Sequence, residues 1–258
     1  MPSYYAKKRL GQNFLKSKEI IDKLVEIINP QGDEKIIEIG PGRGTLTLPL
    51  ASSGATIQAV EYDRDLIEYL EKLLSGYSNV QIINNDFLTY EPPFERYKLA
   101  GNLPFNITSP VIEWAIRHHH QITGAYFLVQ REVAARLASS PGSKNWSPIA
   151  IFTQIYFDIR VHFDINPRHF QPPPKVTSSF IELISKKVAD IKHYKQFEKV
   201  VRTGFKTRRK ILINNIVPDI LPDNALAHKL FIELNFDKHC RAEQLSTIFY
   251  FLRGQDIS

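Results

Sequence analysis

The run Glu38-Ile39-Gly40-Pro41-Gly42-Arg43-Gly44 begins within a short, β-branched, apolar stretch, residues 35–39, and continues beyond its end. Such a stretch is typical of a buried parallel strand. Glycine tolerates a positive φ and lets a ligand approach the backbone, which residues with a Cβ prevent. We predict a helix over residues 45–51, whose first amide groups would point back to the same turn. The run therefore predicts a strand–turn–helix unit that can hold a small ligand.

The spacing of the glycines and a later acid indicate the kind of ligand. Gly-x-Gly-x-Gly differs from the Gly-x-Gly-x-x-Gly of sites that bind a pyrophosphate. Glu61 follows the next predicted strand, residues 56–60, about twenty residues further on. A carboxylate there suits the two hydroxyls of a ribose and would repel a 2′-phosphate. The glycines alone are compatible with a tight turn that binds nothing, but together with Glu61 they favour a nucleoside without a phosphate chain.

Strands and helices alternate along the first 185 residues, which predicts an α/β fold with a doubly wound sheet. Ligands of such sheets bind beyond the carboxyl ends of the strands. Gly40, Glu61, Asp86 and Asn102 all stand at such ends, and four together predict one shared site, although any single acid could be a helix cap. The predicted strands are residues 35–39, 56–60, 80–84, 97–100, 124–130, 149–156 and 179–184, and further helices are predicted over residues 65–74, 110–117 and 132–138.

The stretch Gly101-Asn102-Leu103-Pro104-Phe105 combines an amide, backbone carbonyls and an aromatic ring. These groups suit the exocyclic amine and the flat face of a base. The lone pair of that amine is delocalised into the ring. Acceptors at Asn102 Oδ1 and at the Leu103 or Pro104 carbonyl would draw the nitrogen toward tetrahedral geometry, and such positioning supplies much of the acceleration. With the nucleoside site, the stretch predicts methyl transfer from S-adenosylmethionine to a base nitrogen; the alternative is a plain turn.

Positive charge is concentrated near the C-terminus. The net charge of the chain is +6, and the last 73 residues alone hold 14 Lys and Arg against 8 Asp and Glu. Clustered cations suggest a phosphate backbone as partner, although a basic helix is often only a solvated face. No strongly apolar face accompanies them, which disfavours a membrane surface. The expected nucleic-acid contacts are Lys7, Lys8 and Arg9 near the N-terminus and, beside Lys199, the residues Arg202, Lys206, Arg208, Arg209 and Lys210.

The shift in charge coincides with a change to purely helical patterns, so we predict two domains. Residues 1–187 would form the α/β domain. Residues 188–258 would form a small all-helical domain, with helices over residues 194–205, 208–217, 224–234 and 242–252. A chain of 258 residues is long enough for one large and one small domain.

Composition excludes several other classes of protein. No run of eighteen apolar residues and no leader peptide are apparent, so we expect neither a membrane span nor a signal peptide. The single cysteine, Cys240, cannot form an internal disulfide, which favours a cytoplasmic protein. We expect no metal site, because Cys240 and His239 lack a second pair of ligands and the side chains of residues 118–120 diverge on a helix. We expect a monomer.

With these motifs the chain resembles the ribosomal RNA adenine N6,N6-dimethyltransferases, in particular their bacterial small-subunit members. The glycine-rich motif is shared by many methyltransferases. The N-terminal, Asn-Leu-Pro and Phe-x-Pro-Pro-Pro-Lys-Val segments, in this order, are far more specific. The resemblance covers nearly the whole chain and rests on residues 8–15, 38–44, 61–63, 85–86, 102–105, 170–176 and 205–210.

The resemblance implies a Rossmann-like, S-adenosylmethionine-dependent methyltransferase domain followed by a helical RNA-binding domain. It implies that residues 1–30 form a segment covering the cofactor. The cofactor residues would be Asn13 and Leu15 in that segment, Gly40 at the methionine part, Glu61 at the ribose, Asp86 at the adenine amine and Asn102 beside the methyl group. The catalytic residues would be Asn102, Leu103, Pro104, Phe105 and Phe170.

The substrate that the resemblance implies is 16S ribosomal RNA in a precursor of the small subunit. Two adjacent adenosines in the loop of its 3′-terminal helix would each receive two methyl groups. An adenine stacked in a duplex cannot enter such a pocket, so the base would be unpaired or flipped and held between Phe105 and Phe170. Phe170 could instead be a core aromatic. The family motif commonly ends in tyrosine, so Phe105 implies that the ring acts by stacking.

Three other functions share parts of the pattern. A large-subunit adenine methyltransferase of the macrolide-resistance type is disfavoured by residues 11–15 and 205–210. A non-catalytic assembly or transcription factor is disfavoured because Gly40, Glu61, Asp86 and Asn102 are intact. A DNA adenine methyltransferase usually has an acid where this chain has Asn102.

Overall fold

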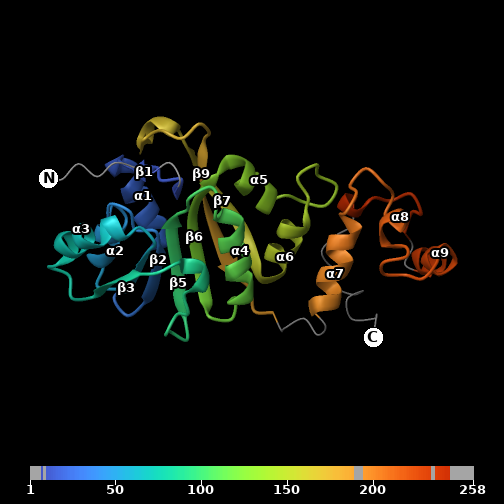
Figure 1. Cartoon of the computed structure of the whole chain (residues 1–258), viewed down its shortest axis with the longest axis horizontal. Coiled ribbons are helices and arrows are strands. Elements are labelled where there is room, and N and C mark those ends of the chain that lie inside the picture. Colours follow the sequence, from blue (N-terminus) through green and yellow to red (C-terminus); the bar gives the residue numbers. More distant parts are fainter. Residues whose placement is uncertain (1–6, 8–9, 189–193, 234–235, 245–258) are drawn as a thin grey trace. The chain divides into compact units, whose positions relative to one another are not determined.

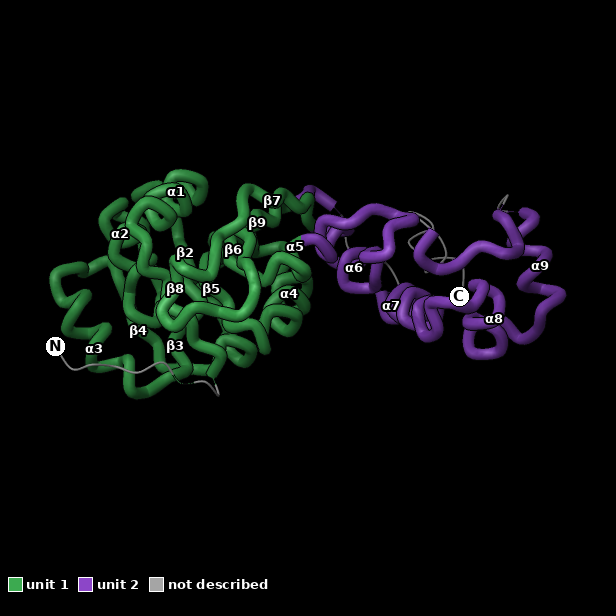
Figure 2. The backbone as a smooth tube through the Cα atoms, turned by 90° about the horizontal axis from the view of Figure 1, so that it is seen from above, with its two compact units in different colours: residues 1–134, 157–185 green, residues 135–156, 186–258 purple. Residues whose placement is uncertain are grey.

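A computed structural model gives the fold and describes residues 7, 10–188, 194–233 and 236–244. Contacts between residues divide the chain into two compact units (Figure 2). Unit 1 comprises residues 1–134 and 157–185, and unit 2 comprises residues 135–156 and 186–258. Residues 135–156 therefore group with the helical part, although the sequence pattern places them in the α/β domain.

Unit 1 is built on a seven-stranded sheet with the order β4-β3-β2-β5-β6-β9-β7 (Figure 1). Strands β4 through β6 pair in parallel, and β9 and β7 extend the sheet antiparallel to β6 and to each other. The α/β fold class predicted from the sequence is confirmed. The strands are β2 (Lys35–Ile39), β3 (Thr56–Glu61), β4 (Val80–Asn84), β5 (Tyr97–Asn102), β6 (Ile122–Gln130), β7 (Phe157–Ile165) and β9 (Ser178–Ser185).

Helices cover both faces of this sheet, and α1 and α4 lie on opposite sides of the strands (Figure 2). In α1, Ile21, Leu24 and Ile28 recur at helical spacing and are buried in one cluster with Ile36 of β2 and Ile57 of β3. The sequence prediction did not include α1. The helical elements of unit 1 are α1 (Lys18–Ile28), α2 (Thr47–Ala51), α3 (Arg64–Leu74), α4 (Thr108–Arg117), η2 (Phe87–Thr89) and η3 (Pro167–His169), and α5 (Arg131–Leu137) crosses into unit 2.

The order of the strands determines where a ligand can bind. The chain proceeds from β2 outward through β3 to β4 and then returns to β5 on the other side of β2. The loops that follow β2 and β5 therefore diverge and leave a crevice at the carboxyl ends of the strands, where ligands of such sheets bind. A short antiparallel ribbon, β1 (Phe14–Leu15) with β8 (Phe170–Gln171), brings the N-terminal segment to the loop between β7 and β9.

The predicted strand over residues 149–156 is wrong: these residues form helix α6 (Pro148–Tyr156). The helix is buried on nearly all sides, so it lacks the polar stripe that reveals a helix in a sequence. Pro148 at its start favours a helix, but the β-branched residues that follow it favour a strand and led to the wrong prediction. The true strand, β7, begins at the next residue and shows the strict alternation Phe-Asp-Ile-Arg-Val-His-Phe-Asp-Ile.

Unit 2 is helical in its described residues, with α6 and α7 joined by aromatic contacts such as Phe152–Phe197, whose ring centroids lie 5.7 Å apart. The helix predicted over residues 208–217 is wrong in its first half, and only α8 forms. Asn215 Nδ2 donates to the carbonyls of Gly204 and Thr207, which stabilises the turn after α7. The helices after α6 are α7 (Tyr194–Gly204), α8 (Ile213–Ile216), α9 (Asn224–Glu233) and η4 (Ala242–Gln244).

Most of the last predicted helix, residues 242–252, lies outside the described residues. Within the part of the chain that the structure describes, none of the helices is long and apolar enough to cross a membrane.

Candidate active site

A cavity of about 240 Å³ lies at the carboxyl ends of β2, β3 and β5. Its wall combines the glycine-rich turn, the end of β3, the loop after β4, the loop after β5 and the N-terminal segment. All ten residues predicted for the cofactor and the target base line this one cavity, namely Asn13, Leu15, Gly40, Glu61, Asp86, Asn102, Leu103, Pro104, Phe105 and Phe170.

The glycine-rich turn leaves room for a ligand at one position. Gly40 has a φ of 64°, and a Cβ placed there would meet no atom within 4 Å. Gly42, with a φ of 58°, instead makes room for protein, since a Cβ there would lie 2.9 Å from the ring of Phe14. The guanidinium of Arg43 covers that ring at 4.7 Å. Gly40 is therefore the point where a ligand can touch the backbone.

Glu61 closes β3 at the side of the cavity and is 5% exposed. Its Oε2 accepts a hydrogen bond from Gly42 N at 3.1 Å and its Oε1 from Asp63 N at 2.8 Å. Burial raises the pKa of Glu61, while the backbone N–H groups of Asp63, Gly42 and Tyr62 lower it. The lone pairs that these donors do not use can accept hydroxyl hydrogens.

Glu38 also lines the cavity. It belongs to the glycine-rich run, but the sequence predicted no role for it in the site. It is 2% exposed, and its Oε2 has no hydrogen-bond partner among the described residues. Burial, and secondarily the charge of Glu61, raise the pKa of Glu38 to about 8, against the lowering effect of the Thr47 hydroxyl. The sequence could have identified Glu38, because it is an acid in a strand predicted to be buried. Burial of an ionised carboxyl costs free energy, so such a residue often belongs to a functional site.

The adenine end of the predicted site has a polar and an aromatic side chain. Asp86 Oδ1 accepts from Leu88 N at 2.9 Å and caps η2, which leaves Oδ2 for a ligand. Tyr62, between Glu61 and Asp63, also lines the cavity and is 65% exposed. The sequence prediction gave Tyr62 no role, although an aromatic ring directly after a predicted ribose carboxylate is a usable signal for a nucleoside site.

The loop after β5 presents its amide in a fixed orientation. Asn102 Nδ2 donates to the Asn13 carbonyl at 2.7 Å. This bond directs Oδ1 away from Asn13, and none of the described residues donates to Oδ1. The Pro104 carbonyl accepts from Ile107 N at 3.1 Å and from Thr108 Oγ1 at 3.3 Å.

The loop therefore offers two free acceptors rather than three. Both lone pairs of the Pro104 carbonyl are engaged, whereas the Leu103 carbonyl accepts no hydrogen bond from the described residues. The sequence prediction left these two carbonyls as alternatives for the second amine hydrogen. The geometry favours Leu103.

The two aromatic rings predicted to hold the base lie in different surroundings. Phe105 is partly exposed in the loop after β5. Phe170 is 1% exposed and packs in the core cluster with Leu15 and Leu24. Its edge contributes to the cavity wall, but its packing matches the alternative of a core aromatic. Phe105 is therefore the ring that a base can reach directly.

The basic residues predicted to bind nucleic acid differ in their partners. Lys7 pairs with Asp63 and Asp65, both at 2.6 Å. Arg202 pairs with Glu198 at 2.8 Å, and Lys206 pairs with Asp219 at 3.1 Å. Lys8 and Arg9 lie outside the described residues.

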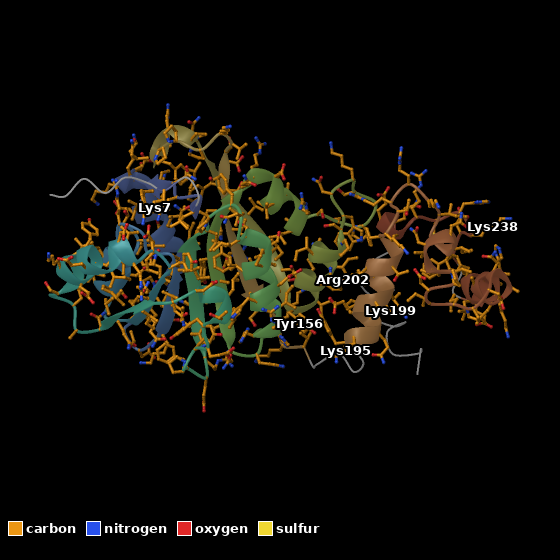
Figure 3. All side chains as sticks on the ribbon, in the orientation of Figure 1. Lys7, Tyr156, Lys195, Lys199, Arg202 and Lys238 are labelled. Carbon is orange, nitrogen blue, oxygen red and sulfur yellow. The ribbon has the colours of Figure 1, made fainter. Side chains whose placement is uncertain are left out.

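The basic residues at positions 208–210, after α7, also differ in their partners. Arg208 Nη2 donates to the carbonyls of Lys144 and Trp146 and pairs with Glu243 at 3.0 Å, all within unit 2. Arg209 and Lys210 are exposed, and their side chains pair with no residue in the described parts of the chain. Lys195, Lys199 and Arg202 follow one another along α7 (Figure 3).

Comparisons with known proteins agree with this geometry. The family model "Ribosomal RNA adenine dimethylase" matches residues 4–253. A protein named ribosomal RNA small subunit methyltransferase A, from Buchnera aphidicola, is 35% identical over 263 aligned positions, which cover 99% of this chain and 98% of the relative.

Solved structures show the same fold. A dimethyladenosine transferase from Plasmodium falciparum has a TM-score of 0.83 at 22% identity and covers 95% of this chain and 98% of its own. The 23S rRNA methyltransferase ErmE has a TM-score of 0.75 at 24% identity, with 95% of this chain and 99% of its own covered. The match of the family model over nearly the whole length, together with the bacterial relative, shows that this chain belongs to the ribosomal RNA adenine dimethylase family.

Proposed function

We propose that the protein uses S-adenosylmethionine to dimethylate N6 of two adjacent adenosines in the 3′-terminal helix loop of 16S ribosomal RNA, in a precursor of the small subunit. The observation that carries the proposal is the fixed amide of Asn102. Its nitrogen is held by the Asn13 carbonyl at 2.7 Å, so its oxygen is presented as an acceptor in the cavity. An acceptor held in this way suits an exocyclic amine.

The residues of the cavity fit the proposed cofactor. Glu61 can accept ribose hydroxyls, Asp86 Oδ2 can accept the adenine amine, and the open space at Gly40 admits the methionine part. Asn13 and Leu15 would cover the cofactor from the N-terminal segment. When bound, S-adenosylmethionine supplies an electrophilic methyl group.

The loop after β5 would act on the target base. Asn102 Oδ1 and the Leu103 carbonyl would accept the two amine hydrogens and so direct the nitrogen lone pair toward the cavity. The methylated nitrogen is acidic enough to release its proton to water, so no side chain is needed as a base. Phe105 would stack on the adenine, which must be unpaired or flipped to enter. Phe170 would support the wall from the core.

Unit 2 would bind the RNA backbone. Exposed cations that lack a protein partner are the best phosphate contacts, since they lose no ion pair on binding, and Arg209 and Lys210 meet this condition among the described residues. Lys199, Arg202 and Lys206 are further candidates. A protein with this substrate would act in the cytoplasm, where ribosomal subunits are assembled, and we propose that it acts as a monomer.

Transfer of a labelled methyl group tests the proposal. Immature small subunits, large-subunit RNA and DNA are each incubated with the protein and labelled S-adenosylmethionine. We expect label in the small subunit alone, as N6,N6-dimethyladenosine at two adjacent positions. Label in large-subunit RNA or DNA would contradict the proposed substrate, and label in none would favour a non-catalytic assembly factor.

Variants of Phe105 test the stacking role within the same assay. Phe105→Tyr keeps the ring and should stay active. Phe105→Ala should lose the 1–3 kcal/mol typical of a base–aromatic stack, or roughly tenfold to a hundredfold in methylation efficiency. Methylation at the parental rate by Phe105→Ala would contradict the role.

A further inference from the structure

Residue 7 and residues 10–15 form a segment, here named the strap, that contacts three different walls of the cavity. At its end, Phe14 and Leu15 pair with β8. In its middle, Gly11 has a φ of 65° and packs so closely on the loop after β5 that a Cβ would lie 3.0 Å from Asn106 Oδ1. Its Asn13 carbonyl holds the amide of Asn102 at 2.7 Å.

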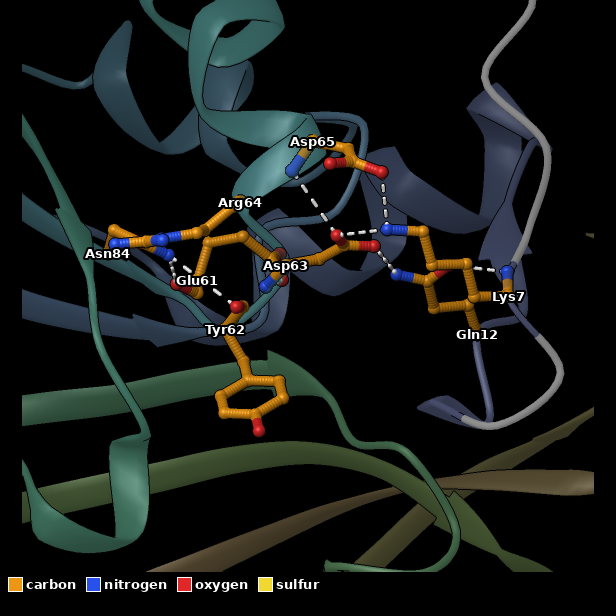
Figure 4. A network of polar contacts seen from close by, with 8 residues as sticks. All are labelled: Lys7, Gln12, Glu61, Tyr62, Asp63, Arg64, Asp65 and Asn84. Carbon is orange, nitrogen blue, oxygen red and sulfur yellow. Dashed lines mark hydrogen bonds and ion pairs between the residues drawn. The ribbon is translucent and has the colours of Figure 1, made fainter.

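The start of the strap is attached to the third wall by a cluster of charges, here named the latch (Figure 4). Lys7 Nζ lies 2.6 Å from both Asp63 Oδ1 and Asp65 Oδ2. Gln12 Nε2 donates to Asp63 Oδ2 at 3.0 Å, and Lys7 N donates to Gln12 Oε1 at 2.8 Å. The latch thus consists of Lys7, Gln12, Asp63 and Asp65.

The latch differs from the exposed lysine pairs on the helices of unit 1. The side chain of Asp63 is 4% exposed and that of Lys7 is 25% exposed, whereas those of Lys18 and Asp22, paired on α1, are 87% and 57% exposed. Exposed pairs contribute little, but a nearly buried carboxylate that loses its cation is left with an uncompensated charge. Loss of the ion pair between Lys7 and Asp63 should therefore destabilise the attachment of the strap.

The latch is also connected to the residue expected to hold the ribose. Asp63 N donates to Glu61 Oε1 at 2.8 Å, and Asp63 Oδ1 accepts from Asp65 N at 3.3 Å at the start of α3. One short turn thus anchors the strap on one side and orients Glu61 on the other. Lys7, Asp63 and Asp65 line a second hollow that shares Tyr62 and Asp86 with the main cavity, so the latch stands where the two hollows adjoin.

We propose that Lys7 is a positioning residue: its ion pairs with Asp63 and Asp65 hold the strap across the cavity, which slows release of the adenosyl ligand and keeps Asn102 oriented by the Asn13 carbonyl. This inference rests on the proposed function. It gives Lys7 a role within the cavity wall in place of the RNA contact predicted from the sequence.

The test compares three variants for binding and release of S-adenosylmethionine. Lys7→Met removes the cation but keeps the length of the side chain, and Lys7→Arg restores the charge. Lys18→Met breaks an exposed lysine pair on α1 and is the matched control. We expect Lys7→Met to raise the dissociation rate and Kd at least about tenfold, the effect of about 1.4 kcal/mol. Lys7→Arg should recover most of this loss, and Lys18→Met should match the wild type.

Salt and steady-state kinetics give readouts that a merely structural role would not move. The dissociation rate of the wild type should rise with salt, because salt screens the exposed half of the latch, the pair of Lys7 with Asp65, whereas that of Lys7→Met should rise less. KM for the cofactor should rise more than kcat falls. If Lys7→Met does not fold, Asp65→Asn, at a side chain that is 66% exposed, breaks half of the latch and should show a smaller change in the same direction.

The outcomes separate this inference from the proposed function. If the wild type binds no S-adenosylmethionine, the proposed function fails. If the wild type binds it and Lys7→Met binds and releases it identically, the latch is refuted while the proposed function stands. If Lys7→Met leaves release of the cofactor unchanged but weakens binding to immature subunits and flattens its salt dependence, Lys7 is an RNA contact and the latch is likewise refuted.

Discussion

Replacement of Glu38 by glutamine should change how the stability of the protein depends on pH. Glu38 is 2% exposed in β2, and its pKa is raised to about 8, chiefly by burial and further by the charge of Glu61. In the unfolded chain the same carboxyl has its ordinary pKa of 4.5. Between these two values the folded protein keeps a proton that the unfolded chain has released.

The size of the effect follows from this difference. Because the folded state binds the extra proton, the free energy of unfolding falls by about 1.4 kcal/mol for each pH unit in this interval. The stability associated with Glu38 is complete below pH 4.5 and is lost as the pH rises to about 8. Glutamine does not titrate, so the stability of Glu38→Gln relative to the wild type should increase by about 4 kcal/mol from pH 5 to pH 8.

Urea denaturation of both proteins at pH 5, 6, 7 and 8 measures this quantity. Titrating groups that do not interact with Glu38 are common to the two proteins and cancel in the difference, which leaves Glu61 as the carboxyl whose charge acts on the pKa of Glu38. Glu68→Gln is a suitable control, because the side chain of Glu68 is 79% exposed and paired with Lys72. Parallel stability curves for the wild type and Glu38→Gln would refute the reasoning, since Glu38 would then be ionised in the folded protein at neutral pH.

Four further predictions concern the cavity and unit 2. Glu61→Ala should weaken binding of S-adenosylmethionine in calorimetry by about 2–3 kcal/mol, the loss of two charge-assisted hydrogen bonds, and unchanged affinity in a folded variant would remove Glu61 from the site. Asn102→Ala should abolish methyl transfer in the labelling assay while the melting temperature stays close to that of the wild type; retained transfer would contradict its role. Arg208→Ala should lower stability by about 1–2 kcal/mol without changing the salt dependence of RNA binding, because Arg208 binds two carbonyls and Glu243 within unit 2. The double replacement of Arg209 and Lys210 by alanine should do the reverse, lowering the log–log salt slope by about one to two units, and an unchanged slope would exclude the phosphate contacts.

The sequence was sufficient to predict where polar residues end the parallel strands. Gly40, Glu61, Asp86 and Asn102 come together because each follows a short apolar strand, and parallel strands place their carboxyl ends at one edge. Their roles toward a cofactor and a base remain predictions, but their convergence needed only the local pattern. The α/β class followed from the same alternation.

Other features depend on contacts between distant parts of the chain, and the sequence did not reveal them. Residues 148–156 form a helix that is buried on nearly all sides, so its residues are mostly apolar all round. The sequence therefore lacks the periodic alternation of polar and apolar residues that identifies a helix. That Arg208 binds residues 144 and 146 is set by the folding of unit 2, since nothing local distinguishes it from Arg209. Likewise the pairing of Lys7 with Asp63 joins positions 56 residues apart, so the lysine resembled a free surface cation.

The hydrogen bond from Asn102 to the Asn13 carbonyl has a consequence for which side chains position 102 can accept. A carboxylate there would place an oxygen opposite the carbonyl oxygen of Asn13, with no hydrogen to share between the two acceptors. An acid, which is usual at this point in DNA adenine methyltransferases, is therefore incompatible with this N-terminal segment as it lies here. The segment and the amide form a matched pair. Because the acceptor is a backbone carbonyl, no replacement of the side chain at position 13 removes it. A conversion of one type of motif into the other would require a different path of the segment, and Asn102→Asp alone should displace the segment.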